Sequence, residues 1–163
     1  MQLVAVVIGG SLAILGGIAG NYIFLYLQRK LDRENLKGGF LGEITALNSI
    51  VKKRKYIEHL EGILDMMEKD QVPRPFTFEV THNYFRVYEN NVDKLGLLNQ
   101  PLPELIAQFY TQCFATLEDI IQIKKIAIKE IPIEGLITLY SELLSLFKDN
   151  VKLGEKIIHT IKN

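Results

Sequence analysis

Charge is missing from the first 28 residues of the chain, and cysteine and tryptophan are nearly missing from all of it. Arg29 is the first charged residue, so all 19 basic and 19 acidic residues lie at or beyond it. They balance to a formal net charge of zero, whereas a nucleic-acid binder needs concentrated positive charge. We therefore expect no nucleic-acid partner.

Cys113 is the only cysteine, which excludes an intramolecular disulfide and a zinc site built from cysteine pairs. The apolar neighbours of Cys113 on the same helical face predict a packing role. The three histidines, His59, His82 and His159, lie far apart, and there is no glycine-rich phosphate loop and no nucleophile elbow. We expect no metal and no cofactor.

Residues 3–27 form an uncharged run, LVAVVIGGSLAILGGIAGNYIFLYL, in which Ser11 and Asn21 are the only strongly polar side chains. At about 1.5 Å per residue, a helix of this length spans a bilayer core of about 30 Å. Only Met1 and Gln2 precede the run, which is too long for a signal peptide and lacks a basic leader. We predict a transmembrane anchor over residues 1–28.

Basic residues outnumber acidic residues just after the run. Arg29, Lys30, Arg33 and Lys37 stand against Asp32 and Glu34. By the positive-inside rule this places the N-terminus outside and the C-terminus in the cytoplasm. The expected location is the inner (cytoplasmic) membrane, as a single-pass protein.

The rest of the chain is predicted to be all-α, as a cytoplasmic bundle of about four helices. Apolar residues recur every three, four or seven positions between Leu36 and Met67, which predicts a long juxtamembrane helix over residues 29–72. Gly38 and Gly39 either break this helix or leave a weak point in it. Pro73 ends it.

Residues 73–163 are predicted to form a helical domain that packs with residues 40–72 as one unit. Residues 75–80 alternate aromatic and polar side chains, which predicts an extended connection. A short helix is expected over residues 82–95, with Thr81 as its N-cap and Gly96 as a left-handed C-terminal cap.

Two longer helices close the domain. The first has Pro103 in its opening turn and runs to about Lys129. The second starts after Pro132, and the short break predicts that the two run antiparallel. Its apolar stripe has nearly heptad spacing: Leu136, Tyr140, Leu143, Phe147, Val151, Gly154, Ile158 and Ile161.

Small residues recur along one face of the uncharged run and predict self-association of the helix. They are Ala5, Gly9, Ala13 and Gly17, spaced at four, with the further pair Gly16 and Gly20. The alternative is that glycine and alanine are simply common in membrane helices. We predict a homo-oligomer, with its size left open.

Two groups of basic residues are candidates for contact with lipid headgroups or phosphates. The first is Arg29, Lys30 and Arg33, and the second is Lys52, Lys53, Arg54 and Lys55. The alternative for the second group is a solvated helix face.

Arg54 and His59 fit the pattern Arg-x4-His, which resembles the active-site motif of HEPN-type ribonucleases. That resemblance implies that His59 is a general acid or base and that Arg54 stabilises phosphate. It covers six residues, and Lys55 departs from the polar amide that the family prefers there. The preferred interpretation is that the chain has no catalytic residues.

The segment from Tyr84 to Thr111, YFRVYENNVDKLGLLNQPLPELIAQFYT, resembles a block in small bacterial proteins that have a membrane helix, a juxtamembrane helix and a closing helix. The resemblance implies a helical fold and no chemistry. The layout also resembles, more faintly, the membrane accessory proteins of RNA-targeting CRISPR systems.

We therefore predict a non-enzymatic, membrane-tethered oligomeric interaction module with a cytosolic protein partner. The alternative is a membrane-bound effector of antiviral defence that perturbs the bilayer or cleaves RNA through Arg54 and His59.

Overall fold

The computed structural model describes residues 2–76, 84–125 and 131–163, and within these ranges the protein contains helices and no strand. The predicted all-α fold is therefore confirmed. In chain order the elements are α1 (Gln2–Lys53), α2 (Tyr56–Asp70), α3 (Arg86–Glu89), the 3₁₀ helix η2 (Val92–Leu97), α4 (Leu102–Lys125) and α5 (Ile133–Lys162).

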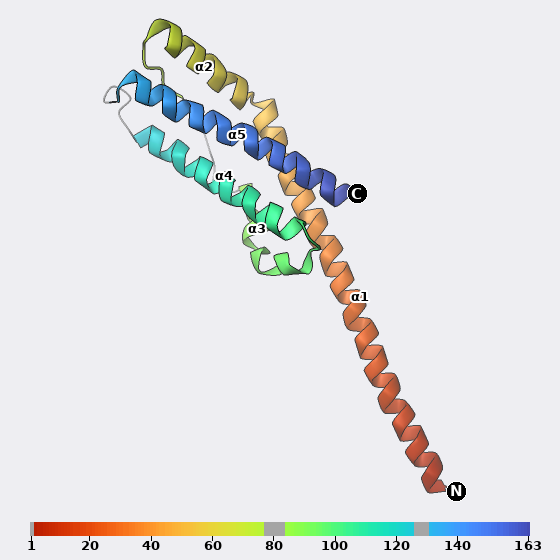
Figure 1. The fold of residues 1–163 in the computed structure, drawn as a ribbon. Helices are drawn as coiled ribbons and strands as arrows, with labels where there is room; N and C mark the ends of the chain where they lie inside the picture. The colour runs from red at the N-terminus through yellow and green to blue at the C-terminus, as the bar shows by residue number, and fades with distance from the viewer. Residues whose placement is uncertain (1, 77–83, 126–130) are drawn as a thin grey trace.

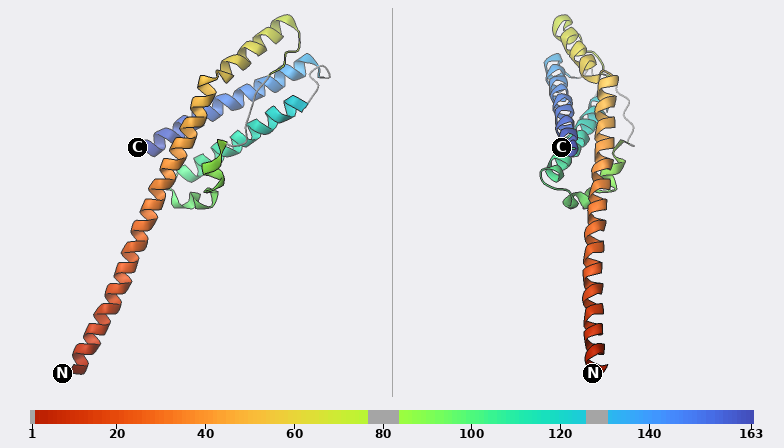
Figure 2. Two further views of the ribbon diagram at one scale, coloured as in Figure 1. Left: turned by 180° about the vertical axis from the view of Figure 1, so that it is seen from behind. Right: turned by 90° about the vertical axis from the view of Figure 1, so that its right-hand side faces the viewer.

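Helix α1 is the longest element, with 52 residues. It continues through Gly38 and Gly39, so the two glycines do not break it. Its C-terminal half packs against the other helices, whereas its N-terminal half projects away from them on its own (Figure 1, Figure 2).

The predicted transmembrane anchor is not supported. Within the part of the chain that the structure describes, no helix is long and apolar enough to cross a membrane. The predicted single-pass location in the inner membrane, with the N-terminus outside, is therefore wrong. Residues 2–28 are the beginning of a helix that continues to Lys53.

The predicted single helix over residues 29–72 is divided in two. Arg54 and Lys55 form a turn between α1 and α2, and Lys55 adopts a left-handed conformation with φ 52° and ψ 43°. A left-handed residue cannot continue a right-handed helix, so the chain changes direction here. In Figure 1, α2 leaves α1 at this turn.

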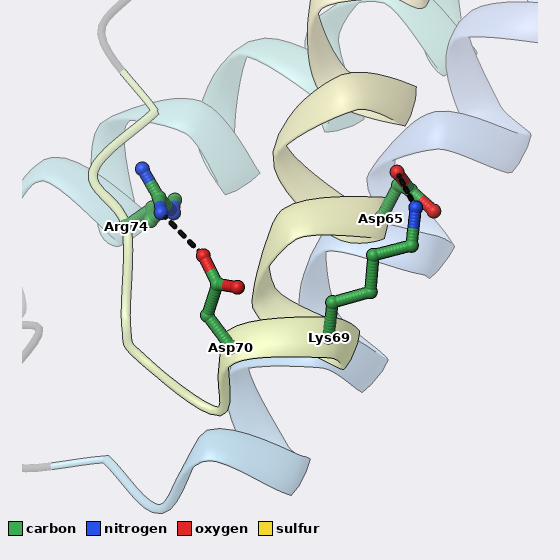
Figure 3. A network of polar contacts seen from close by, with 4 residues as sticks. All are labelled: Asp65, Lys69, Asp70 and Arg74. Atoms are coloured by element: carbon green, nitrogen blue, oxygen red, sulfur yellow. Dashed lines mark hydrogen bonds and ion pairs between the residues drawn. The ribbon is translucent and has the colours of Figure 1, made fainter.

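The end of α2 agrees with the position of the prolines. Gln71 is left-handed, and its backbone N–H donates to the carbonyl of Met67. The Arg74 guanidinium pairs with Asp70 at 2.7 Å across this corner, and Figure 3 shows the two side chains. The hydroxyl of Tyr140 in α5 donates to the carbonyl of Arg74 at 3.1 Å, which fixes the segment to the bundle.

The short helix expected over residues 82–95 is two elements, α3 and η2. Gly96 lies inside η2, and no described glycine has a positive φ, so its predicted role as a left-handed cap is wrong. Thr81 and most of the extended segment lie outside the described residues.

Helices α4 and α5 run antiparallel (Figure 1), and α5 contacts α1, α2 and α4. Pro103 lies in the first turn of α4, as predicted. The stripe of α5 is buried from Leu136 to Gly154, after which Ile157 takes the innermost position and Ile158 is only partly buried.

The buried side chains form two clusters. One joins α2 to the N-terminal half of α5 and the end of α4, around Leu60, Met67 and Tyr140. The other joins the middle of α1 to α3, the start of α4 and the end of α5, around Phe40 and Tyr110. The helices therefore share two cores along their length.

Candidate functional site

The projecting segment of α1, which we define as residues 10–31, is the most unusual surface of the molecule. Its large apolar side chains face solvent; Tyr22 is 73% exposed and Phe24 64%. They are Leu12, Ile14, Leu15, Ile18, Tyr22, Ile23, Phe24, Leu25, Tyr26, Leu27 and Leu31. A monomeric protein rarely exposes so large a continuous apolar surface, so we expect another molecule to cover it.

The small residues predicted to mediate association lie on this segment. Ala13, Gly16, Gly17 and Gly20 are all exposed, and a Cβ atom built on any of the three glycines would meet nothing within 4 Å. The side chains of Ala5 and Gly9 lie outside the described part. This face therefore has room for a second helix.

The structure does not bring the two basic groups together. Arg33 and Lys52 lie roughly 28 Å apart along α1 at 1.5 Å per residue. In the second group, Lys52 pairs with Glu155 of α5 at 2.6 Å. The side chain of Arg54 donates to the hydroxyl of Tyr56 at 2.9 Å. At least two of these cations therefore serve contacts within the chain.

Arg54 and His59 lie on either side of the helix break. Arg54 is in the turn before α2, and His59 is in α2 itself, with both side chains exposed. The ring of His59 lies against the ring of Phe76, with centroids 5.9 Å apart. In the described ranges, no hydrogen bond joins the two residues.

A half-buried carboxylate that the sequence alone did not indicate organises the other end of the bundle. Glu43 in α1 accepts hydrogen bonds from the backbone N–H groups of Val87 at 2.6 Å and Tyr88 at 3.2 Å. It also accepts the hydroxyl of Tyr110 at 2.5 Å. Glu43 thereby caps the start of α3.

The tyrosines around Glu43 are held in fixed positions. The rings of Tyr88 and Tyr110 stack with centroids 4.1 Å apart and an interplanar angle of 13°. Burial, and then the hydrogen bond to Glu43, raises the pKa of Tyr110 far above its usual value, so its hydroxyl stays protonated. This arrangement joins α1, α3 and α4 and gives Glu43 no free oxygen.

A cavity of about 100 Å³ lies between the two core clusters, with walls from α1, α4 and α5. Its lining is mainly apolar and aromatic, and three buried polar residues, Asn48, Thr116 and Asn150, also line it. Cys113 lines it as well. Burial raises the pKa of the Cys113 thiol to about 12, so at neutral pH the thiol is almost entirely protonated and reacts slowly.

Among the residues that the structure describes, no cluster of histidine, cysteine, aspartate and glutamate has the arrangement of a metal site. The cavity and the projecting segment are two features of the described residues that have capacity for binding. Comparison of the chain with protein-family models, curated proteins and solved structures gives no match.

Proposed function

We propose that the protein is a non-enzymatic interaction module that self-associates through the projecting segment of α1. The observation that carries the proposal is the exposure of large apolar side chains from Leu12 to Leu31. Burying apolar surface releases about 25 cal/mol per Å², so association of several such side chains is strongly favoured.

A second copy of the same chain is the cover that we propose. Identical helices bring identical faces together about a twofold axis. Ala13, Gly17 and Gly20 lie along one face, where the absence of bulky side chains lets two backbones approach closely. The projecting segment lies away from the rest of the bundle (Figure 2), so the bundle stays free to bind a protein partner.

Cysteine crosslinking of the full chain tests this proposal. In a Cys113→Ala background, we expect disulfide-linked dimers from Ala13→Cys, Gly17→Cys and Gly20→Cys. Leu15→Cys and Tyr22→Cys are matched controls, because they lie about half a turn from Ala13 on the same helix. We expect at least fivefold less crosslinking at these two control positions.

Two outcomes would contradict the proposal. Equal crosslinking at all five positions would mean that the segment collapses without a defined face. A monomer by sedimentation, with the apolar side chains covered by added lipid or detergent, would show that the cover is not a second copy.

A further inference from the structure

The cavity between the two cores has the size of a small-molecule site. Its volume is about 100 Å³, and an apolar cavity of about 150 Å³ in an engineered protein binds benzene. A single six-membered ring is therefore at the upper limit of what fits. Aromatic rings in the wall, among them Phe85, Phe109 and Phe147, offer flat apolar surfaces to such a ring.

The polar residues in the wall leave one hydrogen-bond acceptor unused. The hydroxyl of Thr116 donates to the carbonyl of Gln112 at 2.8 Å, so its oxygen can only accept a further hydrogen bond. Asn150 therefore turns its NH₂ group toward Thr116, at 3.2 Å. Its Oδ1 atom is left buried and accepts no hydrogen bond within the described ranges.

An unsatisfied acceptor of this kind is costly, because the residue is only 8% exposed and its oxygen has lost its water. Oδ1 of Asn48, the other buried asparagine of the wall, is not among the fully buried atoms without a partner in the described ranges, and its Nδ2 donates to the carbonyl of Val151 at 3.1 Å. The cavity thus has one position where a donor from a ligand would be paired.

The wall also restricts the charge of a ligand. None of the residues that line the cavity is Asp, Glu, Lys, Arg or His, and the thiol of Cys113 is neutral. An ionised ligand would leave water without a partner of opposite charge. The occupant must therefore be neutral.

We propose that this cavity binds a small neutral alcohol of phenol size, whose hydroxyl donates to Oδ1 of Asn150 and whose ring packs against Phe109 and Phe147. The hydroxyl fixes the orientation, and the apolar wall supplies most of the binding free energy. This site is independent of self-association through α1.

Phenol and toluene are the matched probes, because they differ only by a hydroxyl in place of a methyl group. We expect phenol to bind the full chain about tenfold more tightly than toluene, the effect of one additional net hydrogen bond. Binding is measured by calorimetry and by the rise in melting temperature that a ligand of the folded state produces. Phenol should also slow the reaction of Cys113 with a small thiol reagent more than toluene does.

The variant Asn150→Leu removes the acceptor and keeps an apolar side chain of similar size. We expect it to bind phenol and toluene with equal affinity. The ratio of these two affinities does not depend on the stability of the variant, because both are measured on the same protein. Leu117→Phe, which keeps Asn150 and fills the cavity, should weaken both probes at least tenfold.

Failure of phenol to bind the wild-type chain or to protect Cys113 would overturn the proposal. Equal binding of phenol and toluene by the wild type would show that Oδ1 of Asn150 does not take part. If Asn150→Leu does not fold, the Cys113 protection in the wild type and the Leu117→Phe result decide the question.

Discussion

The two halves of α1 belong to one continuous helix but have opposite environments. Phe24, in the projecting segment, is 64% exposed, whereas Phe40, further along the same helix, is 0% exposed. The difference does not lie in the backbone, which is helical at both positions. It lies in whether other elements of the chain reach that part of the helix.

The side chains of each half explain this difference. In the C-terminal half, the buried residues Leu36, Phe40, Ile44 and Asn48 repeat every four positions and form one stripe, while charged residues occupy other faces. Such a stripe specifies a single packing surface. The N-terminal half is apolar on all sides, so no single face is specified by polarity and the small residues alone distinguish one face.

The largest expected effect separates the two halves directly. Phe40→Ala should lower the free energy of unfolding by about 3–5 kcal/mol, because it removes a fully buried ring from the core around Tyr110. Phe24→Ala is the matched control on the same helix; in the dissociated chain, where Phe24 is 64% exposed, it should change the free energy of unfolding by less than about 0.5 kcal/mol. Urea unfolding monitored by circular dichroism measures both.

A loss of stability in Phe24→Ala comparable to that in Phe40→Ala would break the comparison. It would mean that the projecting segment is packed by another copy so firmly that unfolding and dissociation are one event. Dependence of the Phe24→Ala midpoint on protein concentration would identify that case.

The Glu43 cluster predicts the next largest effect. Tyr110→Phe removes the hydroxyl that donates to Glu43, and we expect a loss of about 1.5–3 kcal/mol at pH 7, as for hydrogen bonds to charged groups. Tyr88, which stacks on Tyr110, supplies a control: Tyr88→Phe keeps the stacked ring and leaves the hydrogen bond of Tyr110 in place.

The same substitution has a pH dependence with a definite sign. Because burial raises the pKa of Tyr110 above its ordinary value of 10.0, the folded chain keeps the proton that the unfolded chain loses above pH 10. The stability contributed by the hydroxyl is thus present below pH 10 and falls by about 1.4 kcal/mol per pH unit above it. The difference in the free energy of unfolding between wild type and Tyr110→Phe should therefore narrow between pH 10 and pH 11. A difference that stays constant over this range would contradict the prediction.

What the sequence predicted correctly depends on local signals. The period of apolar residues located the buried stripe of α5, and Pro73 and Pro103 marked an end and a start of helices. Lys55, in contrast, is left-handed without the help of glycine or proline, so no local signal announced the break between α1 and α2.

The candidate sites depend on contacts between distant segments. Glu43 meets Val87 across 44 positions of the chain, and Asn150 meets Thr116 across 34. A single sequence shows that these residues are polar but not which partners they meet. The composition of the apolar run before Arg29 indicates that this surface must be covered, but it does not indicate by which partner.

A smaller effect tests how closely α1 and α5 approach. A Cβ atom at Gly154 would lie 2.5 Å from Nδ2 of Asn48, whose side chain is buried and bonded to Val151. Gly154→Ala should therefore cost about 1–2 kcal/mol, although alanine favours a helix. Gly42→Ala meets nothing within 4 Å and should instead stabilise by up to about 1 kcal/mol. If thermal unfolding shows that Gly154→Ala and Gly42→Ala change stability in the same direction, the contact between residue 154 and Asn48 relaxes freely.

The smallest expected effects are at the turn where α1 ends. Arg54→Ala and His59→Ala should each change the free energy of unfolding by less than about 0.5 kcal/mol, because both side chains are exposed.

The same two variants test the nuclease alternative. If the chain is an interaction module, a single-stranded RNA should stay intact when it is incubated with the wild type or with either variant. Removal of a general acid or base from a ribonuclease lowers its rate by about 10²–10⁴-fold. Arg54→Lys keeps the charge but loses the planar fork of the guanidinium, so it distinguishes phosphate recognition from simple attraction. Cleavage by the wild type that both alanine variants lose while remaining folded would replace the interaction module with a nuclease.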